Sequence, residues 1–189
     1  MTFLMAAMLV GGLTGLDGTY YESRSGQQEG QGVQKAAAAG KSTMKVHYID
    51  VGQGSAVLVQ SGVHFMLIDG GDSDASSKVV SYLKRQKVKK LDYVVVSHYD
   101  SDHLNGVVGA LNVFKVKRVI APAYTADSRV YESYCNIIAQ KKIATTRPKV
   151  GKKYKLGKAR FTILAPNSSG YVDENNYSIA LKLVNGKNR

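Results

Sequence analysis

Apolar runs alternate with short polar or Gly-containing segments along the chain and predict a series of strands and helices after about residue 44. Stretches of five to seven residues rich in Val, Ile, Leu and Tyr have the length and composition of strands. We expect such strands at about 45–51, 56–60, 63–68, 93–97, 116–120, 159–164 and 178–184. The short connections between the first three indicate an antiparallel or mixed sheet.

Three further segments show the spacing of amphipathic helices, at about 74–86, 104–113 and 127–142. Asp74 and Asp127 are the residues expected to cap the first and the third of them. The core faces are expected to carry Val79, Val80 and Leu83 in the first helix and Val130, Tyr134, Ile137 and Ile138 in the third. Strands and helices in this mixed order predict a layered α/β domain over residues 44–189.

The beginning of the chain differs from this domain in composition. Residues 1–16 carry no charge and include an apolar run at 3–10, which is typical of a secretory signal or a short membrane anchor. No Lys or Arg precedes the run, and no clear small-x-small cleavage site follows it. Residues 17–43 are rich in Gly, Ser, Gln and Ala and are expected to form a flexible linker. The pattern favours a secreted or membrane-anchored protein on the extracellular side over a cytoplasmic one.

The formal charge of +12 lies entirely in the predicted domain, where 23 Lys and Arg face 11 Asp and Glu. The basic runs at 84–90 and 149–155 would attract a polyanion such as nucleic acid or teichoic acid, although solvated faces and loops would have the same composition. The single cysteine, Cys135, excludes an internal disulfide framework. Because it lies within a helical pattern, we expect it to be a small buried residue.

Four side chains that commonly bind metals, His98, Asp100, Asp102 and His103, follow directly after the apolar run 93–96. A strand end followed by a tight loop would turn His98 and Asp100 toward one point and Asp102 and His103 toward a second, as in a two-metal hydrolytic centre. A polar turn is the alternative interpretation. It is disfavoured because the cluster contains no Lys or Arg, and neighbouring carboxylates repel unless a cation lies between them.

Three motifs occur together in this order: Asp-Val-Gly-Gln-Gly at 50–54, Leu-Ile-Asp-Gly-Gly at 67–71 and His-x-Asp-x-Asp-His at 98–103. In combination they resemble the metallo-β-lactamase superfamily, and within it the ComEC-like branch, the hydrolase domain of the bacterial competence DNA-uptake protein. Asp100, in the place of the superfamily's second motif His, is a mark of that branch. The segments 164–166 and 175–181 agree with it. The resemblance covers about residues 44–186 and implies an α/β fold, the N-terminal part of a metallo-β-lactamase αββα sandwich.

The resemblance also implies roles for individual residues. His98 and Asp100 would hold one divalent ion, and Asp102 and His103 a second. The ions would be Zn²⁺ or Mn²⁺, since the Asp100 carboxylate makes the first site harder and moves its preference toward Mn²⁺. Asp102 would also be the catalytic group that orients a water molecule or takes its proton.

Further residues would support this centre. Asp69 would stabilise a ligand or the loop backbone by accepting a hydrogen bond, and Gly70 and Gly71 would let backbone pass close to the metal loop. Asn176 and Ser178 are candidate substrate contacts, or else polar residues that flank a hairpin. The strand residues His47 and His64 are interpreted as partly buried or cross-strand residues, not ligands.

The last residues predict an incomplete domain. The apolar stretch 179–184 and the Asn-Gly pair at 185–186 are typical of the first half of a β-hairpin. The superfamily's bridging Asp and its later His-rich segment would lie beyond Arg189, so we expect the chain to stop short of the natural domain.

We therefore expect a metal-dependent hydrolase that acts on a phosphodiester, above all on DNA, through a metal-activated hydroxide. One alternative is a catalytically incompetent fragment that binds polyanions by charge. Another is a hydrolase of a small phosphoester or of a cell-wall polymer. No protein partner is predicted.

Overall fold

The computed structural model describes residues 43–187. The predicted apolar segment 1–16 and the linker as far as residue 42 lie outside these residues. Within the described part, no helix is long and apolar enough to cross a membrane.

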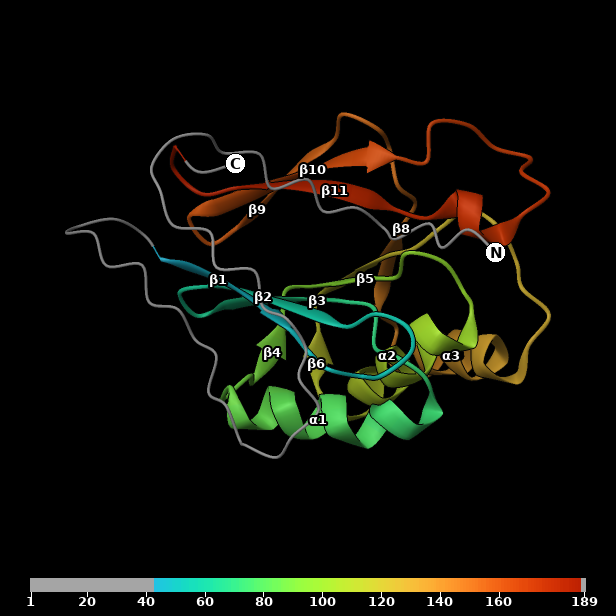
Figure 1. Cartoon of the computed structure of the whole chain (residues 1–189), viewed down its shortest axis with the longest axis horizontal. Helices are drawn as coiled ribbons and strands as arrows, with labels where there is room; N and C mark the ends of the chain where they lie inside the picture. The colour runs from blue at the N-terminus through green and yellow to red at the C-terminus, as the bar shows by residue number, and fades with distance from the viewer. Residues whose placement is uncertain (1–42, 188–189) are drawn as a thin grey trace.

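The described residues form three layers (Figure 1). Helices cover one face of a six-stranded sheet, and a three-stranded sheet covers the other face. The helices are α1 (Ser76–Arg85), α2 (Ser101–Val113) and α3 (Arg129–Gln140). The large sheet has the order β1 (Met44–Tyr48), β2 (Val57–Ser61), β3 (His64–Ile68), β5 (Tyr93–Val95), β7 (Arg118–Ile120) and β8 (Ala144–Thr146). The predicted layered α/β fold is thus confirmed.

Pairing in the large sheet is mixed, as the short early connections indicated. The first three strands pair antiparallel, and β3, β5, β7 and β8 pair parallel. The smaller sheet is antiparallel, with the order β11 (Ala180–Val184), β10 (Ala159–Ala165) and β9 (Lys153–Leu156). A third, two-stranded parallel pair consists of β4 (Lys90–Leu91) and β6 (Lys115–Val116).

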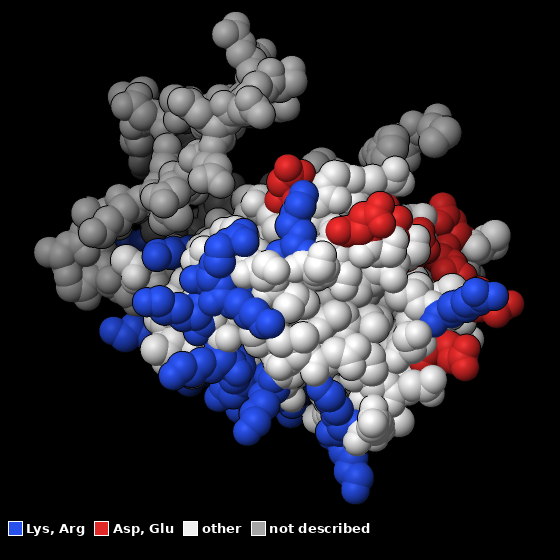
Figure 2. Space-filling model, turned by 90° about the horizontal axis from the view of Figure 1, so that it is seen from below, with Lys and Arg blue, Asp and Glu red and all other residues white. Residues whose placement is uncertain are grey.

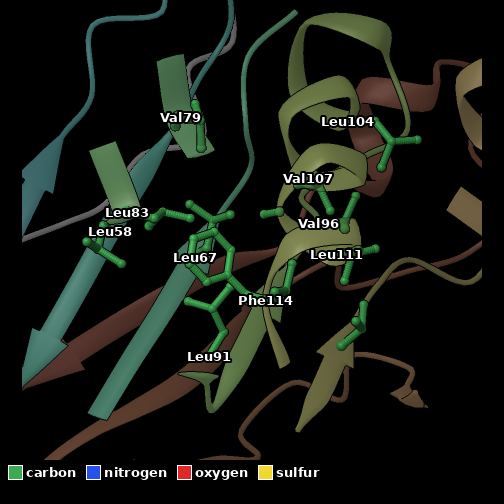
Figure 3. Packing of buried hydrophobic residues seen from close by; sticks show 14 of the residues in the cluster. Leu58, Leu67, Val79, Leu83, Leu91, Val96, Leu104, Val107, Leu111 and Phe114 are labelled. Atoms are coloured by element: carbon green, nitrogen blue, oxygen red, sulfur yellow. The ribbon is translucent and has the colours of Figure 1, made fainter. Parts of the chain in front are cut away.

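One hydrophobic core lies between the helices and the large sheet (Figure 3). Leu67 of β3, Leu83 of α1 and Leu111 of α2 meet there and are all fully buried. Each such side chain contributes on the order of 1.5–3 kcal/mol by its removal from water. The predicted helix faces are correct, since Val79 and Leu83 of α1 and Tyr134 and Ile137 of α3 are buried.

A second core lies between the two sheets. Residues on β9 alternate between exposed and buried, and this period of two directs Tyr154 and Leu156 inward. Phe161 and Ile163 of β10 point the same way and are fully buried against Met66 and other residues of the large sheet. The apolar inner face of the three-stranded sheet therefore packs against the large sheet and holds the two sheets together.

The start of α2 differs from the prediction. The helix begins at Ser101, three residues earlier than expected, so Asp102 and His103 lie in its first turn and not in a loop. The polar sequence conceals this start, because Asp and Ser are common both in turns and at the beginning of helices.

The predicted helix caps are wrong by one or two positions. The first predicted helix divides into a 3-10 turn, η1 (Ser73–Ala75), and α1, and Asp72 caps η1 by accepting a hydrogen bond from the Ser73 backbone. Ser128, not Asp127, caps α3 through the backbone N–H of Tyr131. Neighbouring Asp and Ser residues are similar in capping ability, so sequence alone does not choose between them.

Other differences concern short elements and one side chain. The predicted strand at 116–120 divides into β6 and β7, and β4, β8, β9 and the 3-10 turn η2 (Glu174–Tyr177) were not predicted. Elements of two to four residues are too short to show a period. Cys135 is exposed, which corrects its expected burial. It follows Tyr134, which takes the buried position on that turn of α3.

Candidate metal centre

The topology brings two of the predicted site segments to the same edge of the large sheet. Strands β3 and β5 are parallel neighbours, with Ile68 opposite Val95. Because their carboxyl ends meet, Asp69 after β3 lies beside Ser97 and His98 after β5. The helix α2 starts three residues after His98 and adds its first turn to this edge.

Asp69 is the centre of a buried hydrogen-bond network. Its carboxylate accepts hydrogen bonds from the Ser97 backbone N–H and the Ser97 hydroxyl, both at 2.7 Å, and lies 3.0 Å from Nδ1 of His103. The residue is 1% exposed and adopts a left-handed φ of 55°. Such a conformation costs about 1 kcal/mol outside glycine, and the three contacts that it makes possible hold it in place.

His98 is oriented from both sides of its Nδ1 atom. The residue is 3% exposed, and Nδ1 lies 3.0 Å from the Ser97 hydroxyl and 3.3 Å from the Ser178 hydroxyl. Since the Ser97 hydroxyl donates to Asp69, it accepts from Nδ1–H of His98. The other ring nitrogen, Nε2, then faces Oδ2 of Asp100 at 3.5 Å with its lone pair available.

His103 is held in a similar way. Its Nδ1–H donates to Asp69, and its Nε2 faces Oδ2 of Asp102 at 3.9 Å. The rings of His98 and His103 lie next to each other, with centroids 4.1 Å apart. The site therefore consists of two adjoining pairs, each with one imidazole nitrogen and one carboxylate.

Asp100 occupies the N-cap position of α2 but makes no capping hydrogen bond with its side chain. An Asp at this position normally stabilises a helix by about 1 kcal/mol through such a bond. Here its carboxylate faces His98 instead. Asp100 therefore lacks the capping hydrogen bond that would stabilise α2, and its side chain faces the site instead. Loss of a favourable local interaction in this way is typical of functional positions.

Glycines allow the motif loops to lie directly against α2. The backbone N–H of Gly70 donates to the His103 carbonyl at 2.8 Å. A Cβ atom on Gly70 would lie 2.3 Å from the Val107 nitrogen, and one on Gly106 would lie 1.9 Å from the Gly70 oxygen. A Cβ on Gly54 would lie 1.9 Å from the Asp102 carbonyl oxygen. The close backbone approach predicted for Gly70 is thus confirmed, and its counterpart Gly106 was not predicted.

The two imidazoles have opposite pKa shifts. Burial lowers the pKa of His98, and the adjacent His103 lowers it further. Burial also acts to lower the pKa of His103, but the hydrogen bond and charge of Asp69, together with the charges of Asp102 and Asp100, raise it above its ordinary value. The neutral ring, which is the form that binds metals, is therefore favoured more strongly at His98.

A cavity of about 370 Å³ adjoins the two pairs. It is lined by Tyr99, Asp100, Ser101, Asp102, Ala126, Asp127, Ser128 and Glu174. Four of these residues are carboxylates, and none is Lys or Arg. The surroundings of the site are therefore acidic, although the domain as a whole is basic.

The donor set fits divalent metal ions. Two ligands that each lie about 2.1 Å from a tetrahedral ion are about 3.4 Å apart. The 3.5 Å between His98 and Asp100 is close to this value, and the 3.9 Å between His103 and Asp102 needs only a small adjustment. Among residues 43–187, no group of three or more His, Cys, Asp or Glu side chains is arranged to hold a metal. The described residues therefore offer two ligands at each of two points.

Of the other predicted residues, Ser178 lies at the site beside His98, whereas Asn176 is exposed in η2 and its backbone N–H bonds to the Asp173 carbonyl. His47 is buried, with Nδ1 2.9 Å from the Tyr82 hydroxyl. His64 pairs with Asp92 at 3.0 Å, away from the site.

Two contributions to the site were missed by reasoning from the sequence. Ser97, which is fully buried, bridges Asp69 and both imidazoles, and its place beside His98 at a strand end was the available signal. Tyr124 accepts a hydrogen bond from the Tyr99 backbone at 2.8 Å and packs on Tyr177 with ring centroids 4.6 Å apart. These tyrosines are far apart in the sequence and show no pattern that would have indicated their contact.

Comparisons with known proteins identify a matching family and several relatives. The family model described as "Metallo-beta-lactamase superfamily" matches residues 49–162. Recombination protein 2 of Haemophilus influenzae is 26% identical over an alignment of 153 residues, and the match covers 78% of this chain and 18% of that protein. ComE operon protein 3 of Bacillus subtilis is 26% identical over an alignment of 162 residues, with 75% of this chain and 21% of that protein covered. Competence protein ComA of Neisseria gonorrhoeae is 28% identical over an alignment of 138 residues, with 72% of this chain and 18% of that protein covered.

The chain thus spans about a fifth of the length of these relatives. Among solved structures, MEM-A1, a subclass B3 metallo-beta-lactamase from a soil metagenome library, matches with a TM-score of 0.53 and 18% identity. The match covers 76% of this chain and 57% of that chain, and it supports the fold.

Proposed function

The chain belongs to the metallo-β-lactamase superfamily, a generally hydrolytic superfamily, and from this premise we propose that it is a metal-dependent phosphodiesterase that acts on DNA. The proposal depends above all on one observation. Two imidazoles lie side by side, each with Nδ1 bonded to the protein and Nε2 directed at a carboxylate. If the two His–Asp pairs served only as ion pairs, neither imidazole ring would need a further buried group to orient it.

His98 with Asp100 and Asp102 with His103 would hold two divalent ions, Zn²⁺ or Mn²⁺. A divalent ion, when bound, polarises a phosphoryl oxygen and lowers the pKa of water. Asp69 and Ser97 keep the rings in one tautomer and orientation. Asp102, with a side chain that is 24% exposed, is the group placed to orient a water molecule or accept its proton.

DNA as the substrate is supported by the relatives and by charge. One relative is named a competence protein and another a recombination protein. The domain carries the whole net positive charge of the chain, but the cavity beside the site is lined by carboxylates. A polyanion would be repelled from this cavity unless divalent ions neutralise it, so the proposed reaction is strictly metal-dependent. We also propose a location on the outer side of a bacterial membrane, which the uncharged apolar run at 3–10 favours.

A nuclease assay tests the site, with the full chain, end-labelled DNA and either Mn²⁺ or Zn²⁺. We expect Asp102→Asn to reduce the cleavage rate by about 100-fold or more, because loss of a positioned acid–base group alone costs at least that factor. Asp127→Asn is the matched control, since Asp127 lines the same cavity but belongs to neither pair. It should cleave within about threefold of wild type. Equal cleavage by wild type and Asp102→Asn would refute the assignment of the site.

The second candidate function is binding of polyanions without catalysis. It is favoured by the finding that the described residues offer only two ligands at each point. The same assay distinguishes it, because a chain that binds DNA but cleaves neither DNA nor a chromogenic phosphodiester with either metal is a binding protein. Cleavage of the chromogenic substrate alone would identify a small phosphoester as the substrate.

A further inference from the structure

Charges on the helix side of the molecule are separated by sign (Figure 2). Lys and Arg side chains gather toward one end, and most Asp and Glu side chains lie toward the other. The cavity beside the metal pairs is lined by residues at the start of α2, whereas Lys115 and Lys117 follow the end of that helix. The basic residues therefore do not surround the proposed catalytic site, and they need a separate explanation.

The basic end is formed by two segments that are distant in sequence. Here this name denotes the exposed residues Lys84, Arg85, Lys87, Lys89, Lys115 and Lys117. Strands β4 and β6 join the segments in parallel, with Lys90 opposite Lys115. Asp92 offsets the charge of Lys90, but Lys115 stays close to Lys89 and Lys117 without a carboxylate partner among the described residues.

Neighbouring carboxylates do not neutralise this cluster. Asp92 is the single acidic residue in 76–99, and 103–126 contains none. Asp92 is buried and already pairs with His64 and Lys90, at 3.0 Å and 3.6 Å. Within residues 43–187, none of the six side chains of the basic end forms a salt bridge with a carboxylate.

Several lysines outside the basic end have structural roles. Nζ of Lys141 donates to the carbonyls of Leu111 and Asn112 at 2.7 and 2.6 Å, which satisfies the C-terminus of α2. Lysines of the run 149–155 lie at or beside β9, an edge strand, where exposed charge prevents pairing with other chains. Among the described residues, Lys89, Lys115 and Lys117 donate to no helix carbonyl. The strands beside them, β4 and β6, are half as long as β9 and offer little edge for another chain to pair with.

We propose that the basic end binds the phosphate backbone of nucleic acid, at a surface separate from the metal pairs. This inference rests on the proposed function, in which nucleic acid is the substrate. Several exposed cations without bound carboxylates are the usual electrostatic basis for binding a phosphate backbone. The nucleic acid is held at the basic end, and a different part of the same strand reaches the metal-dependent site.

Fluorescence anisotropy with a fluorescein-labelled 30-nucleotide single strand tests this surface, using the full chain in EDTA so that no cleavage occurs. The test variant combines Lys89→Gln, Lys115→Gln and Lys117→Gln. The matched control combines Lys149→Gln, Lys152→Gln and Lys153→Gln, which removes the same charge from exposed positions on another layer. Circular dichroism checks that both are folded.

We expect the test variant to bind about tenfold more weakly at low salt. Loss of three phosphate contacts should also reduce the slope of log affinity against log salt by about 2. The control should stay within about twofold of wild type.

Equal weakening of both variants would overturn the proposal, because only net charge would then matter. So would absence of oligonucleotide binding by wild type, with or without binding to vesicles of anionic phospholipid. If binding behaves as expected while the metal-loaded wild type cleaves no DNA, the phosphodiesterase proposal fails and the binding surface stands.

Discussion

The site end and the basic end of this domain are built in different ways. At the site end, polar side chains from the segments after β3 and β5 and from the segment before β11 bond to one another, and glycines bring backbone segments into direct contact. At the basic end, exposed side chains project from two short segments and make few contacts. Chemistry at defined atoms needs many tertiary contacts, whereas an electrostatic field needs only exposure. Substitutions should therefore have large, specific effects at the first end and small, graded effects at the second.

The largest expected effect comes from Gly106→Ala at the site end. Alanine normally stabilises a helix interior by up to about 1 kcal/mol relative to glycine. Here its Cβ would lie 1.9 Å from the Gly70 carbonyl oxygen, which belongs to backbone and has no room to move. We expect the free energy of unfolding, measured in urea, to fall by about 3 kcal/mol or more.

Gly109→Ala in the same helix is the control for this substitution. The atom that its Cβ would meet is the Ser76 hydroxyl, at 2.3 Å, and this side chain is able to rotate away. We expect little change or a small gain in stability. A stable Gly106→Ala protein with unchanged metal affinity would show that the backbone contact at the site is not required.

Asp69→Asn should have an intermediate effect. The amide fits the left-handed backbone, but it has one acceptor oxygen for the Ser97 and His103 donors that the carboxylate now serves. We expect a loss of about 1–3 kcal/mol in unfolding free energy. Metal affinity, measured by titration calorimetry with Mn²⁺ or Zn²⁺, should fall by about 10- to 100-fold.

Asp92→Asn makes the matching change near the basic end. Asp92 is also a buried carboxylate, with His64 and Lys90 as its partners. This variant should lose stability but keep the metal affinity of wild type. If the two Asn variants weaken metal binding equally, the proposed division between the ends is wrong.

The smallest expected effect concerns His47, a buried histidine outside the site. Burial lowers its pKa, and the charge of Lys45 lowers it further, in contrast to His103, whose pKa is raised by carboxylates. In the unfolded chain His47 takes up a proton below pH 6.5, while in the folded protein it stays neutral to a lower pH. Its contribution to stability is therefore complete above pH 6.5 and is lost as the pH falls toward the folded pKa.

Replacement of this histidine isolates its contribution. Urea unfolding of wild type and His47→Gln between pH 7.5 and 5.5 should show a smaller loss of stability at low pH in the variant. Parallel curves for the two proteins would contradict the assigned shift. Comparison at each pH cancels the contributions of the other histidines.

Much of the fold was predictable because its signals are local. The apolar faces of α1 and α3 follow from a period of about 3.6 residues that each segment displays by itself. Val79, Leu83, Tyr134 and Ile137 are buried as expected. Elements of two or three residues such as β4 and β8 display no period. The burial of Cys135 was wrongly predicted because its position on the helix was judged by residue type instead of by the face that Tyr134 occupies.

The sequence by itself determined which residues carry the candidate chemistry and how much charge the domain has. His98, Asp100, Asp102 and His103 lie within six residues, so covalent geometry alone keeps them near one another. Only the tertiary structure decided what orients them and where the charge lies. Asp69 is 28 residues from Ser97, and Ser178 is 80 residues from His98. Contacts over such separations depend on strand order and register, as does the placement of most carboxylates at one end and many lysines at the other.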